Sequence, residues 1–111
     1  MAVLASEALV EAVDGQFSFR LIDRVAVKGK REAVRVYELL GEGSSPDAFP
    51  AERAYERALH AYFVRDFGAA LESLALLGDD PPSRMLALRC HALLAHPPSD
   101  DWNGIYVAPS K

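Results

Sequence analysis

Hydrophobic positions near the start of the chain predict a short strand followed by a short helix. Val3–Ala5 is an apolar run, and Ser6 after it is suited to cap a helix with Glu7 favourable in the first turn. Apolar residues at helical spacing extend the helix over residues 6–13. Gly15 suits the left-handed position that ends it. Because no turn or cap precedes this strand, which we expect to be buried, the segment reads as the end of something longer.

The hydrophobic period then changes to two, which is typical of strands. Phe17–Val27 alternates apolar and polar residues, and the pattern slips near Ile22, which indicates a β-bulge. The polar segment Lys28–Glu32 is the predicted turn, and "AVRVYELL" at residues 33–40 returns as the second strand. Together these segments predict a β-hairpin with a basic, glycine-containing tip.

The second half is predicted to be helical. Residues 41–49 are rich in Gly, Ser and Pro and are expected to form a linker. Pro50 suits a helix start, and the first predicted helix reaches Val64 with an apolar stripe formed by Ala54, Tyr55, Ala58, Leu59 and Tyr62. A second helix follows over residues 69–78, ended by Gly78. The whole chain is therefore predicted to be α+β, with the sheet elements first.

A third helix is expected from Ser83 to about Ala95, ended by Pro97 and Pro98. Its residues available for packing are Met85, Leu86, Leu88, Leu93 and Leu94. The remaining residues are expected to be irregular, with Trp102 folding back onto the helices as a cap. A role of Trp102 in binding a partner is the alternative.

Composition and charge exclude several function classes. The chain has 111 residues and a formal net charge of −4, with no basic cluster beyond Lys28–Arg31, which argues against nucleic-acid binding. No apolar run approaches the roughly 18 residues of a membrane-spanning helix. The first residues lack the basic region of a signal peptide. With one cysteine, Cys90, no internal disulfide can form, so a reducing compartment such as the cytoplasm is expected.

The first forty residues resemble the end of the catalytic domain of class III nucleotidyl cyclases, the adenylate/guanylate cyclase family. The resemblance lies in the strand "VLAS", the short helix "EALVEAV", and the hairpin "FSFRLIDRVAVKGKREAVRVYELLG" with its "KGK" tip. It implies that residues 1–40 are a strand, helix and closing hairpin of such a domain, acting in cyclic nucleotide signalling. It also implies that Lys28 lies near the nucleotide triphosphate, where a flexible ammonium suits phosphate charge. From spacing alone, Lys28 and Lys30 are a solvated hairpin tip.

The same resemblance implies that most of the cyclase active site lies elsewhere. The family needs two metal ions, Mg or Mn, held by carboxylates, and an Asn/Arg pair that stabilises the transferring phosphate. Those groups precede the matching segment in the family, and Asp14, Asp23 and Asp47 do not stand in the family's metal-binding motifs. We therefore expect the isolated chain to bind no cofactor and to form no cyclic nucleotide. Its expected partner is the rest of the cyclase domain or a cyclase-domain dimer partner.

Residues 50–111 are similar to a tetratricopeptide-type helix pair with a third helix, a tail found in bacterial cyclases of this family. Ala58, Phe67, Ala70, Leu71 and Pro82 follow the spacing of that repeat. The motifs "RC", "PP" and "WNG" fit the end of the tail, where relatives often have Trp-Asp-Gly. The alternative function is a stand-alone helical module that binds another protein, because one helix pair rarely buries a continuous core alone.

Other candidate chemistry is weak on sequence grounds. Cys90, His91 and His96 lack a second ligand pair, so a buried thiol and surface histidines are expected in place of a metal site. Ser6, His60 and Asp66 share no motif context for a catalytic triad. The aromatic residues of the helices are expected to be core: Tyr55, Tyr62, Phe63 and Phe67.

Overall fold

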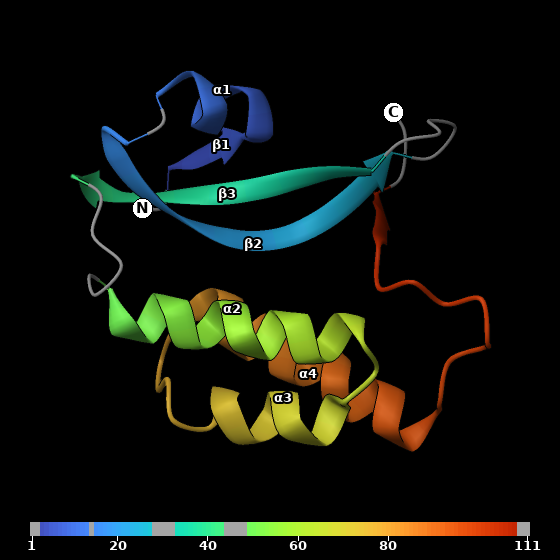
Figure 1. Cartoon of the computed structure of the whole chain (residues 1–111). Helices are drawn as coiled ribbons and strands as arrows, with labels where there is room; N and C mark the ends of the chain where they lie inside the picture. Colours follow the sequence, from blue (N-terminus) through green and yellow to red (C-terminus); the bar gives the residue numbers. More distant parts are fainter. Residues whose placement is uncertain (1–2, 14, 28–32, 44–48, 109–111) are drawn as a thin grey trace. The chain divides into compact units, whose positions relative to one another are not determined.

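The structure, a computed structural model, describes residues 3–13, 15–27, 33–43 and 49–108. Its chain is α+β, as predicted, and divides into two compact units (Figure 1). The sheet unit is Met1–Phe49 with Ile105–Lys111, and the helical unit is Pro50–Gly104. The elements in chain order are β1 Leu4–Ser6, α1 Glu7–Ala12, β2 Phe17–Val27, β3 Ala33–Glu42, α2 Pro50–Phe63, α3 Phe67–Leu74, α4 Pro81–Ala95 and β4 Tyr106–Ala108.

The sheet unit is a four-stranded sheet in the order β1-β3-β2-β4. The predicted hairpin is confirmed, since β2 and β3 pair antiparallel from Phe17 opposite Glu42 to Ala26 opposite Ala33. The register shifts between Leu21 and Asp23, which places the expected bulge at Ile22, and it shifts again after Ser18. β1 pairs antiparallel with β3, so it forms one edge of the sheet.

The start of the chain forms the predicted strand and helix, but its side chains are more exposed than expected. The Ser6 Oγ accepts a hydrogen bond from the Leu9 amide at 3.3 Å, which confirms Ser6 as the N-cap of α1. Gly15 has the expected left-handed backbone, with φ of 81°. The expectation of a buried strand is wrong: Ala5 is buried, whereas Val3 and Leu4 are exposed. No residue of α1 is buried.

The hairpin extends further than the sequence predicts. β3 continues to Glu42, two residues into the expected linker. Its end is held by backbone and side-chain bonds, because the Gly43 amide donates to the Gln16 carbonyl and the Ser18 hydroxyl donates to the Gly43 carbonyl at 2.6 Å. Residues 44–48 of the predicted linker lie outside the described part of the chain.

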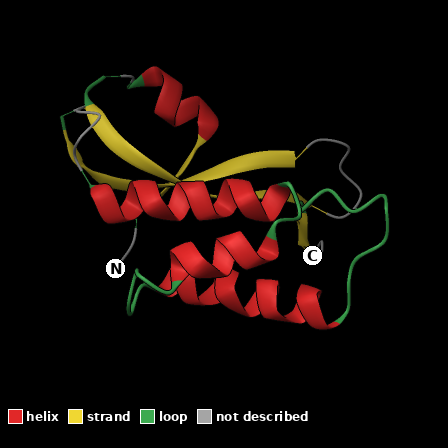
Figure 2. Cartoon of the chain, turned by 60° about the horizontal axis from the view of Figure 1, so that its bottom comes forward, coloured by secondary structure: helices red, strands yellow, loops and turns green. Residues whose placement is uncertain are grey.

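The three predicted helices form the helical unit, and Figure 2 shows them as neighbouring rods. α3 and α4 each begin two residues before the predicted start because aspartates cap them. The Asp66 carboxylate accepts from the Ala69 amide at 3.2 Å, and that of Asp80 accepts from the amide and the hydroxyl of Ser83. α3 ends at Leu74, earlier than predicted, and tight turns lead on to Gly78.

The core of the helical unit follows the predicted stripe of α2, with a correction in α4. Its buried residues are Tyr55, Ala58, Leu59, Tyr62, Phe67, Ala70, Leu74, Ser83, Leu86 and Cys90. Ala58 and Ala70 have no exposed surface, so small residues lie where the helices meet. Leu86 packs as expected, but Met85, Leu88 and Leu94 do not, because they lie on the exposed surface.

The last residues combine a predicted and an unpredicted feature. Trp102 folds back onto the helices as expected, with its ring 5.2 Å from that of Tyr62 and 5.4 Å from that of Phe67. From the sequence, residues 50–111 are expected to form one helical tail with an irregular end. In the structure β4 is instead a strand, parallel to β2, with Tyr106 opposite Val25, so Ile105–Lys111 belongs to the sheet unit.

Candidate functional site

The predicted phosphate contact, Lys28, and its neighbour Lys30 are outside the described residues. The strands on either side of this segment in the sequence are described up to Val27 and from Ala33.

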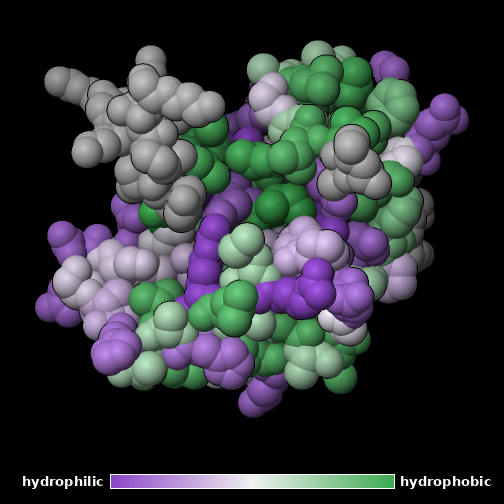
Figure 3. Space-filling model, turned by 180° about the vertical axis from the view of Figure 1, so that it is seen from behind, coloured by the Kyte–Doolittle hydropathy of each residue, from purple (hydrophilic) through white to green (hydrophobic). Residues whose placement is uncertain are grey.

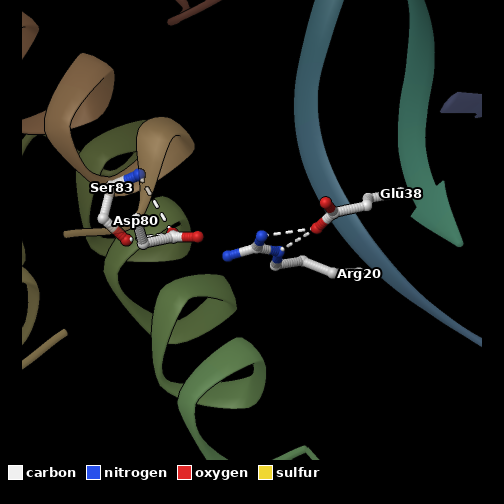
Figure 4. Close-up of polar contacts among 4 residues, drawn as sticks. All are labelled: Arg20, Glu38, Asp80 and Ser83. Atoms are coloured by element: carbon white, nitrogen blue, oxygen red, sulfur yellow. Dashed lines mark hydrogen bonds and ion pairs between the residues drawn. The ribbon is translucent and has the colours of Figure 1, made fainter. Parts of the chain in front are cut away.

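A buried ion pair lies in the middle of the hairpin (Figure 4). The Arg20 guanidinium contacts the Glu38 carboxylate through Nε at 2.9 Å and through a second nitrogen, and Arg20 is only 4% exposed. The two residues face each other across β2 and β3. Both nitrogens contact the same carboxylate oxygen, Oε1. A charge-assisted contact between directly opposite residues favours one pairing of the strands, so we assign it to holding strand register. The pair could not be singled out from the sequence, because both strands carry other charged residues.

The residues considered for metal binding or nucleophilic chemistry have structural roles. Cys90 is buried, and this burial raises the pKa of its thiol from 9.0 to about 11, while the neighbouring Arg89 lowers it by less. A buried neutral thiol is a poor nucleophile. His91 and His96 are exposed, as expected. Within the described part of the chain, no three His, Cys, Asp or Glu side chains come together as metal ligands.

In the Ser6, His60 and Asp66 combination, Ser6 and Asp66 are helix caps. The Ser6 and Asp66 oxygens accept amide hydrogen bonds at the starts of α1 and α3. His60 lies on the exposed surface of α2. Caps of this type satisfy amides that have no partner within the helix, so these side chains are accounted for without catalysis.

An aromatic cluster in the helical unit is also structural. Tyr62, Phe67 and Trp102 meet edge to face, and the Arg65 guanidinium lies 5.7 Å from the Trp102 ring centre. Arg65 also donates to the carbonyls of Pro98 and Ser99 at 2.9 and 2.8 Å. These contacts hold the segment after α4 against the corner between α2 and α3.

Each unit contains a hollow with a mainly apolar lining among its described residues. In the sheet unit a hollow of about 110 Å³ is lined entirely by apolar residues: Val3, Ala5, Leu9, Val13, Phe17, Phe19 and Leu39. Figure 3 shows hydrophobic surface gathered at the top of the view, where this part of the sheet unit lies. In the helical unit a groove of about 390 Å³ runs between α3 and α4, lined by Leu71, Leu74, Ala75, Gly78, Ser83, Arg84, Ala87 and His91.

No family model, curated protein or solved structure matches the chain. No helix in the described part of the chain is long and apolar enough to cross a membrane.

Proposed function

We propose that residues 1–40 are the C-terminal part of a class III nucleotidyl cyclase domain, and that they contribute to cyclic nucleotide synthesis together with the rest of such a domain. The resemblance of the strand, helix and "KGK" hairpin supports this proposal. The order strand, helix, hairpin in the sheet unit agrees with it. The buried free thiol of Cys90 fits a reducing compartment, and we place the protein in the cytoplasm.

The observation that carries the proposal is the missing core of the sheet unit. Among its described residues, Ala5 is the only buried hydrophobic residue, and the other buried hydrophobic residues of the described chain lie in the helical unit. Val3, Leu4 and Leu9 are exposed, and Val3 and Leu9 line the hollow that is formed only by apolar side chains. An apolar surface of this kind marks a place where more protein packs. The family resemblance implies that this additional protein is the remainder of a cyclase domain.

In the proposed assembly this chain contributes one group to the chemistry. The Lys28 ammonium would contact the triphosphate, and Gly29 beside it lets the backbone approach closely. The resemblance implies that the rest of the domain would hold Mg or Mn and the groups that stabilise the transferring phosphate. We therefore expect this chain to be inactive alone.

A chimeric cyclase tests the role of Lys28. The terminal strand, helix and hairpin of an active class III cyclase are replaced by residues 1–43 of this chain, and cyclic nucleotide formation from ATP or GTP is measured. We expect Lys28→Ala to raise KM for the nucleotide or lower kcat by about tenfold or more, because an ammonium at a phosphate is lost. Lys30→Ala is the matched control, and we expect it to change either constant less than about twofold. Equal effects of the two variants would contradict the assignment.

A second function is favoured by the helical unit. α4 exposes Met85 and Leu88, which are 58% and 69% exposed, and the groove beside it is open. The tail is therefore also a candidate for binding another protein, independently of the cyclase proposal.

A further inference from the structure

We propose that the groove between α3 and α4, with the adjoining exposed surface of α4, binds an amphipathic helix that carries acidic side chains beside its apolar stripe. The inference deepens the protein-binding role of the helical unit and does not rest on the cyclase proposal. We define the docking surface as Leu71 of α3 and Ala75 at the α3 C-cap, with Arg84, Ala87, Leu88 and His91 of α4.

The groove has an apolar lining with polar residues on one side. Leu71 of α3, Ala75 at its C-cap and Ala87 of α4 are apolar, and the polar lining residues on α4 are Ser83, Arg84 and His91. Its volume is about 390 Å³. An apolar floor between two helices, bordered by charge, is the setting in which amphipathic helices dock.

The exposed side of α4 continues this apolar surface. Met85, Leu88 and Ala92 are all exposed and are spaced by three and four residues, so they form one row along the helix. In stacked helical arrays the outer face of a terminal helix is normally polar. α4 instead exposes an apolar row beside Arg84 and His91, and we infer that a partner covers this row.

The arrangement of the helices indicates that the partner bound along α4 is another helix. Figure 1 shows α2, α3 and α4 running in alternating directions, and α3 contacts both α2 and α4. A further helix laid along α4 would contact α3 as well, because the groove lies between them. It would occupy the next position in the same alternating series.

Charge decides between an acidic partner and a second copy of this chain. α4 contains Arg84, Arg89 and His91 and no acidic residue, although the whole chain has a net charge of −4. Packing two copies of α4 together would bring like charges into contact, which disfavours self-association. An acidic helix is attracted instead, and the exposed Arg84, which contacts Asp79 at 2.7 Å, can share a second carboxylate.

Binding of two synthetic peptides to the full 111-residue chain tests the proposal. Both peptides are amphipathic helices of 15 residues, the length of α4, with the same leucine and alanine stripe. One carries glutamate beside the stripe and the other carries lysine. By fluorescence anisotropy at low salt we expect the glutamate peptide to bind about tenfold tighter or more, and added salt to shrink the difference.

Matched variants locate the binding surface. We expect Leu88→Glu to weaken binding of the glutamate peptide about tenfold or more, since it puts an acid at the centre of the surface. Leu76→Glu makes the same change at a residue that is 86% exposed in the turn after α3, and we expect less than about a twofold effect. Neither variant should alter the Tm of the free chain, because both positions are exposed.

Three outcomes would overturn the proposal. The first is no preference for the glutamate peptide. The second is an equal effect of the two substitutions on binding. The third is a clear fall in Tm for Leu88→Glu alone, which would mean that the chain itself already covers this surface. The cyclase proposal is tested by nucleotide turnover instead, so either proposal can fail while the other stands.

Discussion

At the scale of single residues, Gly104 is the described glycine at which an added Cβ would make the closest steric clash. Its backbone is left-handed, with φ of 80°, and a Cβ added there would lie 2.4 Å from the Phe63 ring. The glycine directly follows the segment that brings Trp102 onto Tyr62 and Phe67. Its role is to let the chain pass close to the aromatic cluster, where any side chain would push the rings apart.

We predict that Gly104→Ala lowers the free energy of unfolding by about 1–3 kcal/mol, because it adds both backbone strain and a steric clash. Urea unfolding followed by Trp102 fluorescence and by circular dichroism measures the change. Gly68→Ala is the matched control, since Gly68 lies in α3 with ordinary backbone and open space around it. That substitution should be neutral or stabilising by up to about 1 kcal/mol. A Gly104→Ala protein as stable as the parent would refute the steric account.

At the scale of elements, the hairpin contains an ion pair whose arginine is buried. Arg20 on β2 and Glu38 on β3 are opposite each other, close to the bulge at Ile22. A slip of one residue would move each side chain to the other face of the sheet. The pair therefore specifies which residues of β2 lie opposite which residues of β3.

We predict that Glu38→Gln lowers the free energy of unfolding by about 3 kcal/mol, because it removes the carboxylate charge beside a buried guanidinium. The control is Glu7→Gln at the exposed pair between Glu7 and Arg35, whose atoms are 3.1 Å apart. There we expect a loss of less than about 1 kcal/mol. Thermal unfolding of both variants measures the difference, and similar small losses would show that the Arg20–Glu38 pair does not hold the register.

The elements that could be predicted from the sequence are those with local signals. The alternation of Phe17–Val27 predicts its strand, and Ser6 predicts the cap of α1. β4 could not be predicted, because a three-residue strand depends on pairing with β2 far away in sequence. The exposed residues of α4 were misassigned because this helix is apolar on more than one side, so periodicity does not define its buried face.

The candidate sites were predictable to a smaller extent than the fold. Lys28 rests on family resemblance alone, because a Lys-Gly-Lys turn has no distinctive local pattern. The groove between α3 and α4 was not predicted, since it depends on which side of each helix faces the other. The buried state of Cys90 was anticipated, because free cysteines are among the most buried residue types.

At the scale of the whole molecule, the two units differ in how many of their hydrophobic residues are buried. The helical unit contains nearly all the buried hydrophobic residues that the described part of the chain provides, whereas the sheet unit contributes Ala5. A small unit without its own core is marginally stable. We therefore interpret the sheet unit as a piece that becomes complete when it packs against further protein, and a cyclase domain is our proposed complement.

Reconstitution of cyclase activity from separate polypeptides tests this central claim most directly. A class III cyclase domain that lacks its terminal strand, helix and hairpin is mixed with the purified 111-residue chain, ATP or GTP, and Mg or Mn, and cyclic nucleotide formation is measured. We expect no product from either protein alone and product from the mixture. Product from the chain alone, or none from the mixture while the intact cyclase is active in the same assay, would contradict it.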